Sequence, residues 1–294
     1  MQNATPQGLV KRFITRSFAG TTDLLPNERS VITDIGGKRY RIASDDDYVS
    51  NLGAHFEPSM VALFDALIER HHTVLDIGAN IGCTTLLFAD RARQIYSFEP
   101  SPSTFRFLEK NIATAGAENI VATNIGLGKT AGTFELTFSP NNRSGAFVSN
   151  QLQASDGHQV ESIRIAQGDE YIRNASIPKI DFIKIDVEGF EKDVIEGLAR
   201  TLLRDMPTVV LELNHWCLNA FQRISVPDFF DFLRNTFPYL YAIDADDAKN
   251  IHDRNESYHV MYHHIVGGFK YPNLVGAFSK DQLRRFAEFY RVSL

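Results

Sequence analysis

The feature that most constrains the fold of this chain is VLDIGANIG at residues 74–82, where an apolar run meets two closely spaced glycines. The apolar run predicts a buried strand, and TTLLFADRA just beyond it predicts a helix. Glycines in a turn between a strand and a helix let the backbone approach a ligand closely, and the start of the helix presents unpaired N–H groups. A glycine-rich turn is a weak signal by itself, so its meaning depends on the rest of the chain.

Strands and helices alternate on the C-terminal side of this turn. Further strands are predicted at residues 94–100, 120–123, 180–186 and 208–214, with helices at 101–111 and 189–203. β-rich runs between residues 133 and 165 interrupt the alternation and predict a hairpin insertion. Strands that alternate with helices of this length form a mostly parallel sheet with helices on both faces, so we expect an α/β fold.

The two ends of the chain add elements to this core. Around Gly36 and Gly37, residues 31–42 predict a β-hairpin. In the tail we predict an antiparallel strand pair that closes the sheet, preceded and followed by a helix, with the elements at residues 227–237, 239–244, 257–266 and 279–292. We expect an N-terminal helix and β-hairpin extension over residues 1–56 and one domain over residues 57–294.

The second predicted strand ends at Glu99, 21 residues after Gly78. An acid at this point of a Rossmann-type sheet holds the two ribose hydroxyls of an adenosine ligand. A dinucleotide fingerprint needs two further glycines where this chain has Asn80 and Cys83, which disfavours an NAD oxidoreductase. Asp76 would repel a diphosphate but suits the ammonium group of an amino acid, so the turn fits S-adenosylmethionine better than NAD.

Four segments resemble the FkbM-type methyltransferases, a family with the class I S-adenosylmethionine-dependent fold. These segments are VLDIGANIGCTTLLFA, YSFEPSPSTFRFLEKN, FIKIDVEGFEKDVIEGLARTL and VVLELN, and they occur in this order within residues 57–245. The D-x-E-G-x-E core of the third segment is the most discriminating piece. The resemblance implies a Rossmann-like enzyme that usually methylates an oxygen on a sugar or a polyketide-like product.

The resemblance also implies roles for single residues. Gly78, Asn80 and Gly82 would hold the methionine portion of S-adenosylmethionine, and Glu99 would hold the ribose. Asn124 would lie near the adenine. The N-terminal hairpin and the histidine-rich tail match no family motif, so the resemblance does not identify the methyl acceptor.

Acidic residues gather where the fourth and fifth parallel strands are predicted to end. Asp186 and Glu188 follow residues 180–185, and because the carboxyl ends of parallel strands line one crevice, we expect both to face the ligands. Asp186 is therefore a candidate for cofactor binding as well as for catalysis. We expect a metal-free centre, and the alternative is a Mg²⁺ site formed by Asp186, Glu212 and Asn214.

Three residues are candidates for the base that takes the proton of the acceptor. They are His215, which follows the fifth strand, and the carboxylates of Asp186 and Glu188. We predict O-methylation of a hydroxyl group on a carbohydrate or secondary metabolite, with a small molecule or glycan as the partner. The alternatives are N-methylation of an amino sugar and a non-catalytic regulatory protein that binds the cofactor.

The composition of the chain excludes several other classes of protein. The chain has 30 Lys and Arg against 36 Asp and Glu, and a net charge of −6 argues against a nucleic-acid binder. Cys83 and Cys217 form no C-x-x-C pair, so we expect a cytoplasmic protein without a disulfide scaffold. No apolar run reaches the roughly 20 residues that cross a bilayer. A helix over residues 1–20 would either pack on its own domain or lie on a membrane surface.

Overall fold

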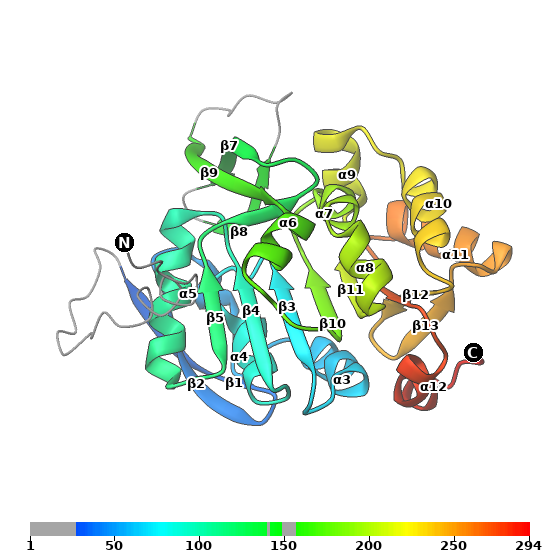
Figure 1. Cartoon of the computed structure of the whole chain (residues 1–294), viewed down its shortest axis with the longest axis horizontal. Coiled ribbons are helices and arrows are strands. Elements are labelled where there is room, and N and C mark those ends of the chain that lie inside the picture. Colours follow the sequence, from blue (N-terminus) through cyan, green and yellow to red (C-terminus); the bar gives the residue numbers. More distant parts are fainter. Residues whose placement is uncertain (1–27, 140–141, 149–156) are drawn as a thin grey trace, which may run out of the picture.

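The structure is a computed structural model that describes residues 28–139, 142–148 and 157–294 (Figure 1). The predicted N-terminal helix lies outside these residues. The described chain forms an eight-stranded sheet, a four-stranded sheet and a two-stranded hairpin. Within these ranges no helix combines the length and the apolar character that spanning a bilayer requires.

The eight-stranded sheet has the strand order β13-β12-β14-β11-β10-β3-β4-β5. Its parallel strands are β3 (Thr73–Ile77), β4 (Gln94–Phe98), β5 (Ile120–Thr123), β10 (Phe182–Ile185) and β11 (Thr208–Glu212). The chain runs outward from β3 to β5 and then returns to place β10 beside β3. Ligands of open α/β sheets bind at the carboxyl ends of the strands where the order reverses in this way. The crevice beyond β3 and β10 is therefore the expected site.

Antiparallel strands complete this sheet on the β11 side. They are β12 (Tyr239–Asp244), β13 (Asp247–Asn250) and β14 (Asn273–Ala277). Strand β14 lies between β11 and β12 and is antiparallel to both. The predicted α/β class with a mostly parallel sheet is confirmed, but the antiparallel strands are not the predicted pair.

The predicted strand at residues 257–266 is wrong, because these residues belong to helix α11 (Arg254–Ile265). Their Tyr, Val and Ile content favours a strand. The side chain of Asp253, however, accepts hydrogen bonds from the N–H groups of Asn255 and Glu256 at 2.9 Å and caps a helix. The buried residues of this helix, Ser257, Val260 and His264, then lie on one face at helical spacing.

Helices cover both faces of the eight-stranded sheet. One face carries α3 (Pro58–Leu67), α4 (Cys83–Ala89), α5 (Pro102–Ala115) and α12 (Arg284–Tyr290); the other carries α7 (Glu191–Gly197), α8 (Ala199–Asp205), α10 (Val226–Thr236) and α11. Successive strand residues point to opposite cores, so Val74 and Phe182 pack on the first face, and Leu75 and Ile183 on the second. Two helices predicted as continuous are interrupted: residues 189–203 contain the α7–α8 break, and η1 (Asp281–Leu283) precedes α12.

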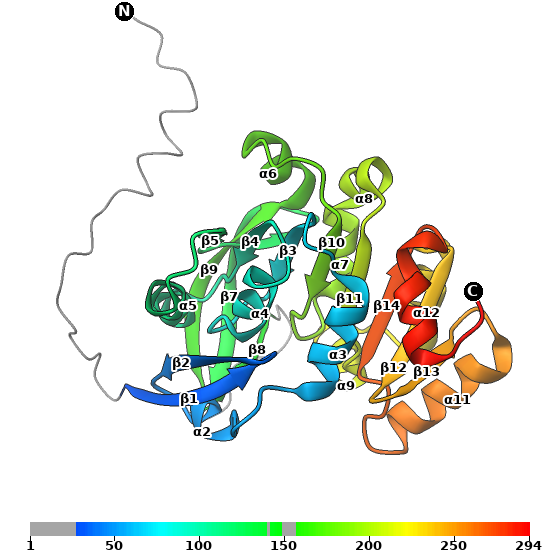
Figure 2. The same cartoon turned by 90° about the horizontal axis from the view of Figure 1, so that it is seen from below.

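The predicted hairpin and insertion are both present. The hairpin consists of β1 (Arg29–Ile35) and β2 (Lys38–Ser44), and Figure 2 shows it beside α2 (Tyr48–Asn51) and α5. The insertion is the four-stranded sheet of β6 (Gly126–Gly128), β9 (Gln159–Gln167), β7 (Gly132–Ser139) and β8 (Asn142–Val148). Helices α6 (Gly168–Asn174) and α9 (His215–Gln222) follow β9 and β11 along the chain. The division of the chain near residue 56 stays a prediction.

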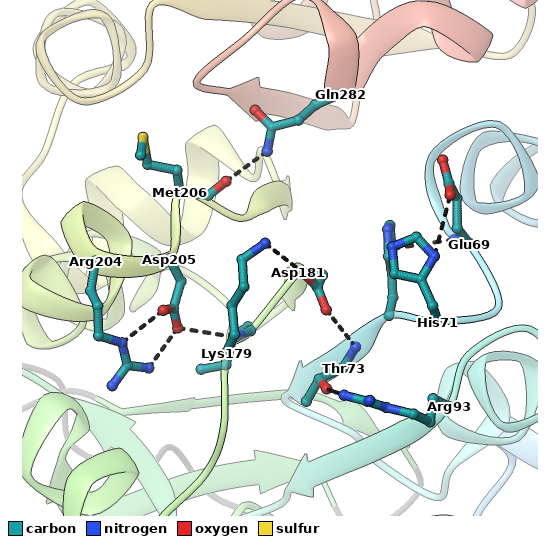
Figure 3. A network of polar contacts seen from close by, with 12 residues as sticks. Glu69, His71, Thr73, Arg93, Lys179, Asp181, Arg204, Asp205, Met206 and Gln282 are labelled. Atoms are coloured by element: carbon teal, nitrogen blue, oxygen red, sulfur yellow. Dashed lines mark hydrogen bonds and ion pairs between the residues drawn. The ribbon is translucent and has the colours of Figure 1, made fainter.

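A network of polar contacts joins the loops at the amino ends of the parallel strands (Figure 3). Asp181 accepts a hydrogen bond from the N–H of Thr73 at 3.0 Å and pairs with Lys179 at 3.1 Å. Asp205 accepts from the N–H of Ile180, also at 3.0 Å. These groups satisfy one another and hold the loops together. The network is therefore structural, and the carboxyl ends of the strands are the place to look for a ligand site.

Candidate active site

The turn after β3 touches the end of β10 through its backbone. Gly78 has a φ of 79°, and a Cβ atom at this position would lie 1.8 Å from the carbonyl oxygen of Asp186. Any side chain here would force the ends of the two strands apart. The N–H groups of Gly78 and Ala79 both donate to the carbonyl of Phe98 at 3.0 Å, which ties the turn to β4 as well.

Glu99 stands at the tip of β4 and faces the same turn. Its Oε2 accepts a hydrogen bond from the N–H of Asn80 at 3.0 Å, and its Oε1 accepts from the N–H of Ser101 at 2.9 Å. Asn80 has a φ of 50°, an uncommon conformation for a residue other than glycine. Burial raises the pKa of Glu99 to about 7, although the two N–H groups favour its ionised form. The carboxylate has lone pairs left for further donors.

A cavity of about 290 Å³ lies over the crevice between β3 and β10. Its polar lining includes residues from all three regions that the sequence singled out, namely Gly78, Asn80, Glu99, Asp186, Glu188 and Glu212. Its apolar wall comes largely from the inserted sheet, through Leu127, Leu136, Ala146, Val148, Ile163 and Ile165, together with Phe190. The cavity thus combines acidic side chains with an apolar wall.

Lys184 connects the parts of this site from beneath. It is 4% exposed, and its Nζ donates to the carbonyl of Gly78 at 2.8 Å. The same ammonium group lies 3.2 Å from Asp186 and 3.6 Å from Asp76. Burial by itself lowers the pKa of Lys184, but the carboxylates of Asp186 and Asp76 outweigh that effect and hold the pKa above its usual value. Lys184 is therefore charged and already paired.

Three carboxyl groups meet at the ends of β10 and β11. Oxygens of Asp186, Glu188 and Glu212 all lie within 4.8 Å of one another, a grouping that can hold a metal ion. Burial and the nearby charge of Asp186 raise the pKa of Glu188 to about 7 and that of Glu212 well above its usual value. The Oε2 of Glu212 is buried and has no hydrogen-bond partner among the described residues. Asn214 adjoins this group, because its side chain donates to Glu188 at 3.1 Å, and its predicted place in a metal site stays a prediction.

Besides Asn214, four predicted residues do not line the cavity. Asp76 is fully buried and accepts hydrogen bonds from Thr84 and Thr85. The other three serve the surrounding structure. Gly82 lets Leu108 pack closely, the side chain of Asn124 donates to the carbonyls of Glu99 and Pro100, and the ring of His215 packs against His264 and Phe269. Their predicted roles toward ligands stay predictions.

Sequence reasoning missed two charged residues of the site. Lys184 lies between Ile183 and Ile185 in an otherwise apolar strand. This isolated charge was the sequence signal that could have identified it as a site residue. Glu57 lines the cavity from the residue before α3, and its φ of 29° is unusual for a residue other than glycine. The available signal in the sequence was its position directly before Pro58, a residue that favours the first turn of a helix.

Comparison with known proteins identifies the family of this chain. The profile of the methyltransferase FkbM domain matches residues 76–244, which is more than half of the chain. A hexuronic acid methyltransferase, AglP of Haloferax volcanii, is 25% identical over 191 residues, covering 63% of this chain and 74% of that protein. Methyltransferase 1 of Beauveria bassiana is 27% identical over 159 residues, covering 48% of this chain and 64% of that protein.

Among solved structures, this chain is similar to methyltransferase FkbM from Methylobacillus flagellatus. It has a TM-score of 0.45 and 15% sequence identity, and the match covers 70% of this chain and 43% of the other. This chain therefore spans less than two thirds of the length of that protein and of the B. bassiana relative.

Proposed function

The chain belongs to the FkbM family of methyltransferases, and on this premise we propose that it transfers a methyl group from S-adenosylmethionine to a hydroxyl group of a carbohydrate or secondary metabolite. The observation that carries the proposal is a single cavity that joins the Gly78 turn, the Glu99 carboxylate and the acidic group around Asp186. The name of one relative, a hexuronic acid methyltransferase, supports a carbohydrate acceptor.

The residues present fit the cofactor. S-adenosylmethionine supplies a methyl group on a positively charged sulfur and leaves as S-adenosylhomocysteine. The Glu99 carboxylate accepts hydrogen bonds from the two ribose hydroxyls. It uses the lone pairs that its hydrogen bonds with the N–H groups of Asn80 and Ser101 leave free. The Gly78 turn lets the backbone approach the methionine portion, and the carboxylate of Asp186 suits its ammonium group. The apolar wall of the inserted sheet accommodates the adenine.

Glu188 acts as the base. It lines the cavity, and its pKa of about 7 matches the working pH of a general base. Bound S-adenosylmethionine would supply the methyl group to the acceptor oxygen and keep the electron pair of the broken carbon–sulfur bond on its sulfur, and Glu188 would take the proton of the acceptor hydroxyl. His215 is less suited to this role, because it lies outside the cavity lining.

This mechanism needs no metal ion, although Asp186, Glu188 and Glu212 have the chemistry to hold Mg²⁺. Assays with EDTA and with added Mg²⁺ separate the two versions. Turnover that survives EDTA supports the metal-free version. Turnover that EDTA abolishes and Mg²⁺ restores assigns the three carboxylates to a metal instead.

Isothermal titration calorimetry with S-adenosylhomocysteine tests the cofactor, and transfer of a labelled methyl group to a pool of glycosides and polyols tests the reaction. Failure of the folded protein to bind S-adenosylhomocysteine refutes the proposal. Binding without transfer to any acceptor favours a regulatory protein. Transfer to amines but not to hydroxyls favours an N-methyltransferase.

A further inference from the structure

A second cavity, of about 260 Å³, adjoins the first at the carboxyl ends of β10 and β11. One side is the first turn of α3, through Ser59 and Met60, and the other is the start of β14, through Pro272 and Asn273. Its floor consists of residues of β10 and β11, namely Lys184, Ile185, Val210, Leu211 and Glu212.

The two cavities share three lining residues, and all three are acids: Glu57, Asp186 and Glu212. A group that passes from a ligand in the first cavity to a ligand in the second must cross beside these carboxyl groups. Glu57 is exposed and stands at this junction on a strained backbone with a φ of 29°. Backbone strain of this kind is found preferentially at ligand sites.

The charges around the second cavity select against an anionic ligand. Its described lining contains three carboxyl groups and one ammonium group, that of Lys184. This ammonium already contacts Asp76, Asp186 and the carbonyl of Gly78, so it is not free to receive a carboxylate or phosphate of a ligand. An acidic sugar would therefore place its charge against like charges without a compensating cation.

The same lining has donor groups on Ser59 and Asn273, but one of its acceptor oxygens is unsatisfied. The buried Oε2 of Glu212 has no partner among the described residues, and a buried oxygen without a partner is costly. A hydroxyl or amine of a ligand in this cavity would satisfy it.

We propose that the second cavity binds the methyl acceptor and that this acceptor is an uncharged or amine-bearing polyol, such as a neutral or amino sugar, rather than a uronate. This inference rests on the methyltransferase function proposed above. Glu57 and Glu212 accept hydrogen bonds from the acceptor, and the carboxylates of Glu57 and Asp186 exclude anions. The acceptor class then differs from the hexuronic acid in the name of the Haloferax volcanii relative.

Three matched probes test the charge preference on the full chain saturated with S-adenosylhomocysteine. They are the 4-nitrophenyl glycosides of glucose, glucosamine and glucuronic acid, whose dissociation constants are measured by titration calorimetry or saturation-transfer NMR. We expect the glucoside and the glucosaminide to bind at least about tenfold more tightly than the glucuronide, because like charges brought together at a binding site weaken it strongly.

Two variants and one control locate the effect. Glu57→Gln should tighten glucuronide binding by about threefold, the modest size expected for an exposed charge. Ser59→Trp should fill the second cavity and abolish glycoside binding while S-adenosylhomocysteine still binds. Glu288→Gln removes the same charge from an exposed residue that lines neither cavity, so it should change neither affinity.

Equal or tighter binding of the glucuronide overturns the inference, and so does the absence of binding by all three glycosides when S-adenosylhomocysteine binds normally. Glycoside binding that survives Ser59→Trp also overturns it. In each of these cases the cofactor proposal stands. A chain that does not bind S-adenosylhomocysteine at all refutes both.

Discussion

The role of Glu99 gives the sharpest test of the cofactor site. Replacement by Gln keeps the size of the side chain but removes its charge and turns one acceptor oxygen into a donor amide. In the structure both oxygens face N–H groups, those of Asn80 and Ser101, so the amide of the variant also meets an N–H. The variant therefore loses acceptor capacity toward both the loop and the ribose.

The size of the effect follows from the number of hydrogen bonds. The carboxylate has about four acceptor positions, and the loop uses two, which leaves two for ribose hydroxyls. Hydrogen bonds to charged groups contribute roughly 1.5–3 kcal/mol each. Loss of one such bond and weakening of the other should cost about 2–4 kcal/mol, so the dissociation constant of S-adenosylhomocysteine should rise roughly 30-fold to 700-fold.

The dependence on pH provides an internal check. Burial raises the pKa of Glu99 to about 7, and ribose hydroxyls bind best to its ionised form. Binding must therefore release a proton below pH 7, and the affinity of the wild type should fall by up to about tenfold for each pH unit below 7 and level off above pH 8. Calorimetry from pH 5.5 to 8.5 measures this slope, which should be absent in Glu99→Gln.

Asp205→Asn is the matched control. Asp205 and Glu99 are both 7% exposed and both accept a backbone N–H, but Asp205 lies in the network at the opposite edge of the sheet (Figure 3). This variant should lose stability without a change of more than about threefold in affinity, since it touches no ligand. A Glu99→Gln protein that is folded and binds S-adenosylhomocysteine within threefold of wild type would refute the ribose role.

Three further perturbations test other parts of the site. Lys184→Met leaves Asp76 and Asp186 without their buried cation, so it should lower the free energy of unfolding by about 3–5 kcal/mol. Urea denaturation measures this loss, and a loss below about 1 kcal/mol contradicts the pairing. Gly78→Ala should unfold the chain or abolish S-adenosylhomocysteine binding, because its Cβ would lie 1.8 Å from a carbonyl oxygen, and circular dichroism with calorimetry distinguishes these results; a folded variant with normal binding contradicts the close approach. Glu188→Gln should lower kcat by about 10²-fold to 10⁴-fold and leave the affinity for S-adenosylhomocysteine within a few fold, whereas unchanged turnover in single-turnover assays excludes this residue as the base.

Local patterns were enough to predict the core of the fold. The apolar runs at β3, β10 and β11 and the helices between them predicted a mostly parallel sheet, and the spacing from Gly78 to Glu99 placed two parts of one crevice. These predictions succeeded because each depends on residues that are near one another along the chain. Helix α11 was mistaken for a strand, because its composition favours a strand and only the Asp253 cap and the packing of one face favour the helix.

The sequence by itself determined the family, the class of fold and the presence of acids at the ends of successive strands. The tertiary structure decided which of these acids share a cavity: Glu188 and Glu212 do, whereas Asp76 is buried beside Lys184. It also placed His215, a candidate base, against α11. It also brought Glu57, from the residue before α3, to the junction of the two cavities. The physical reason is that these contacts join residues far apart in the chain, so they depend on how the helices pack on the sheet, which the spacing of residues along the sequence does not encode.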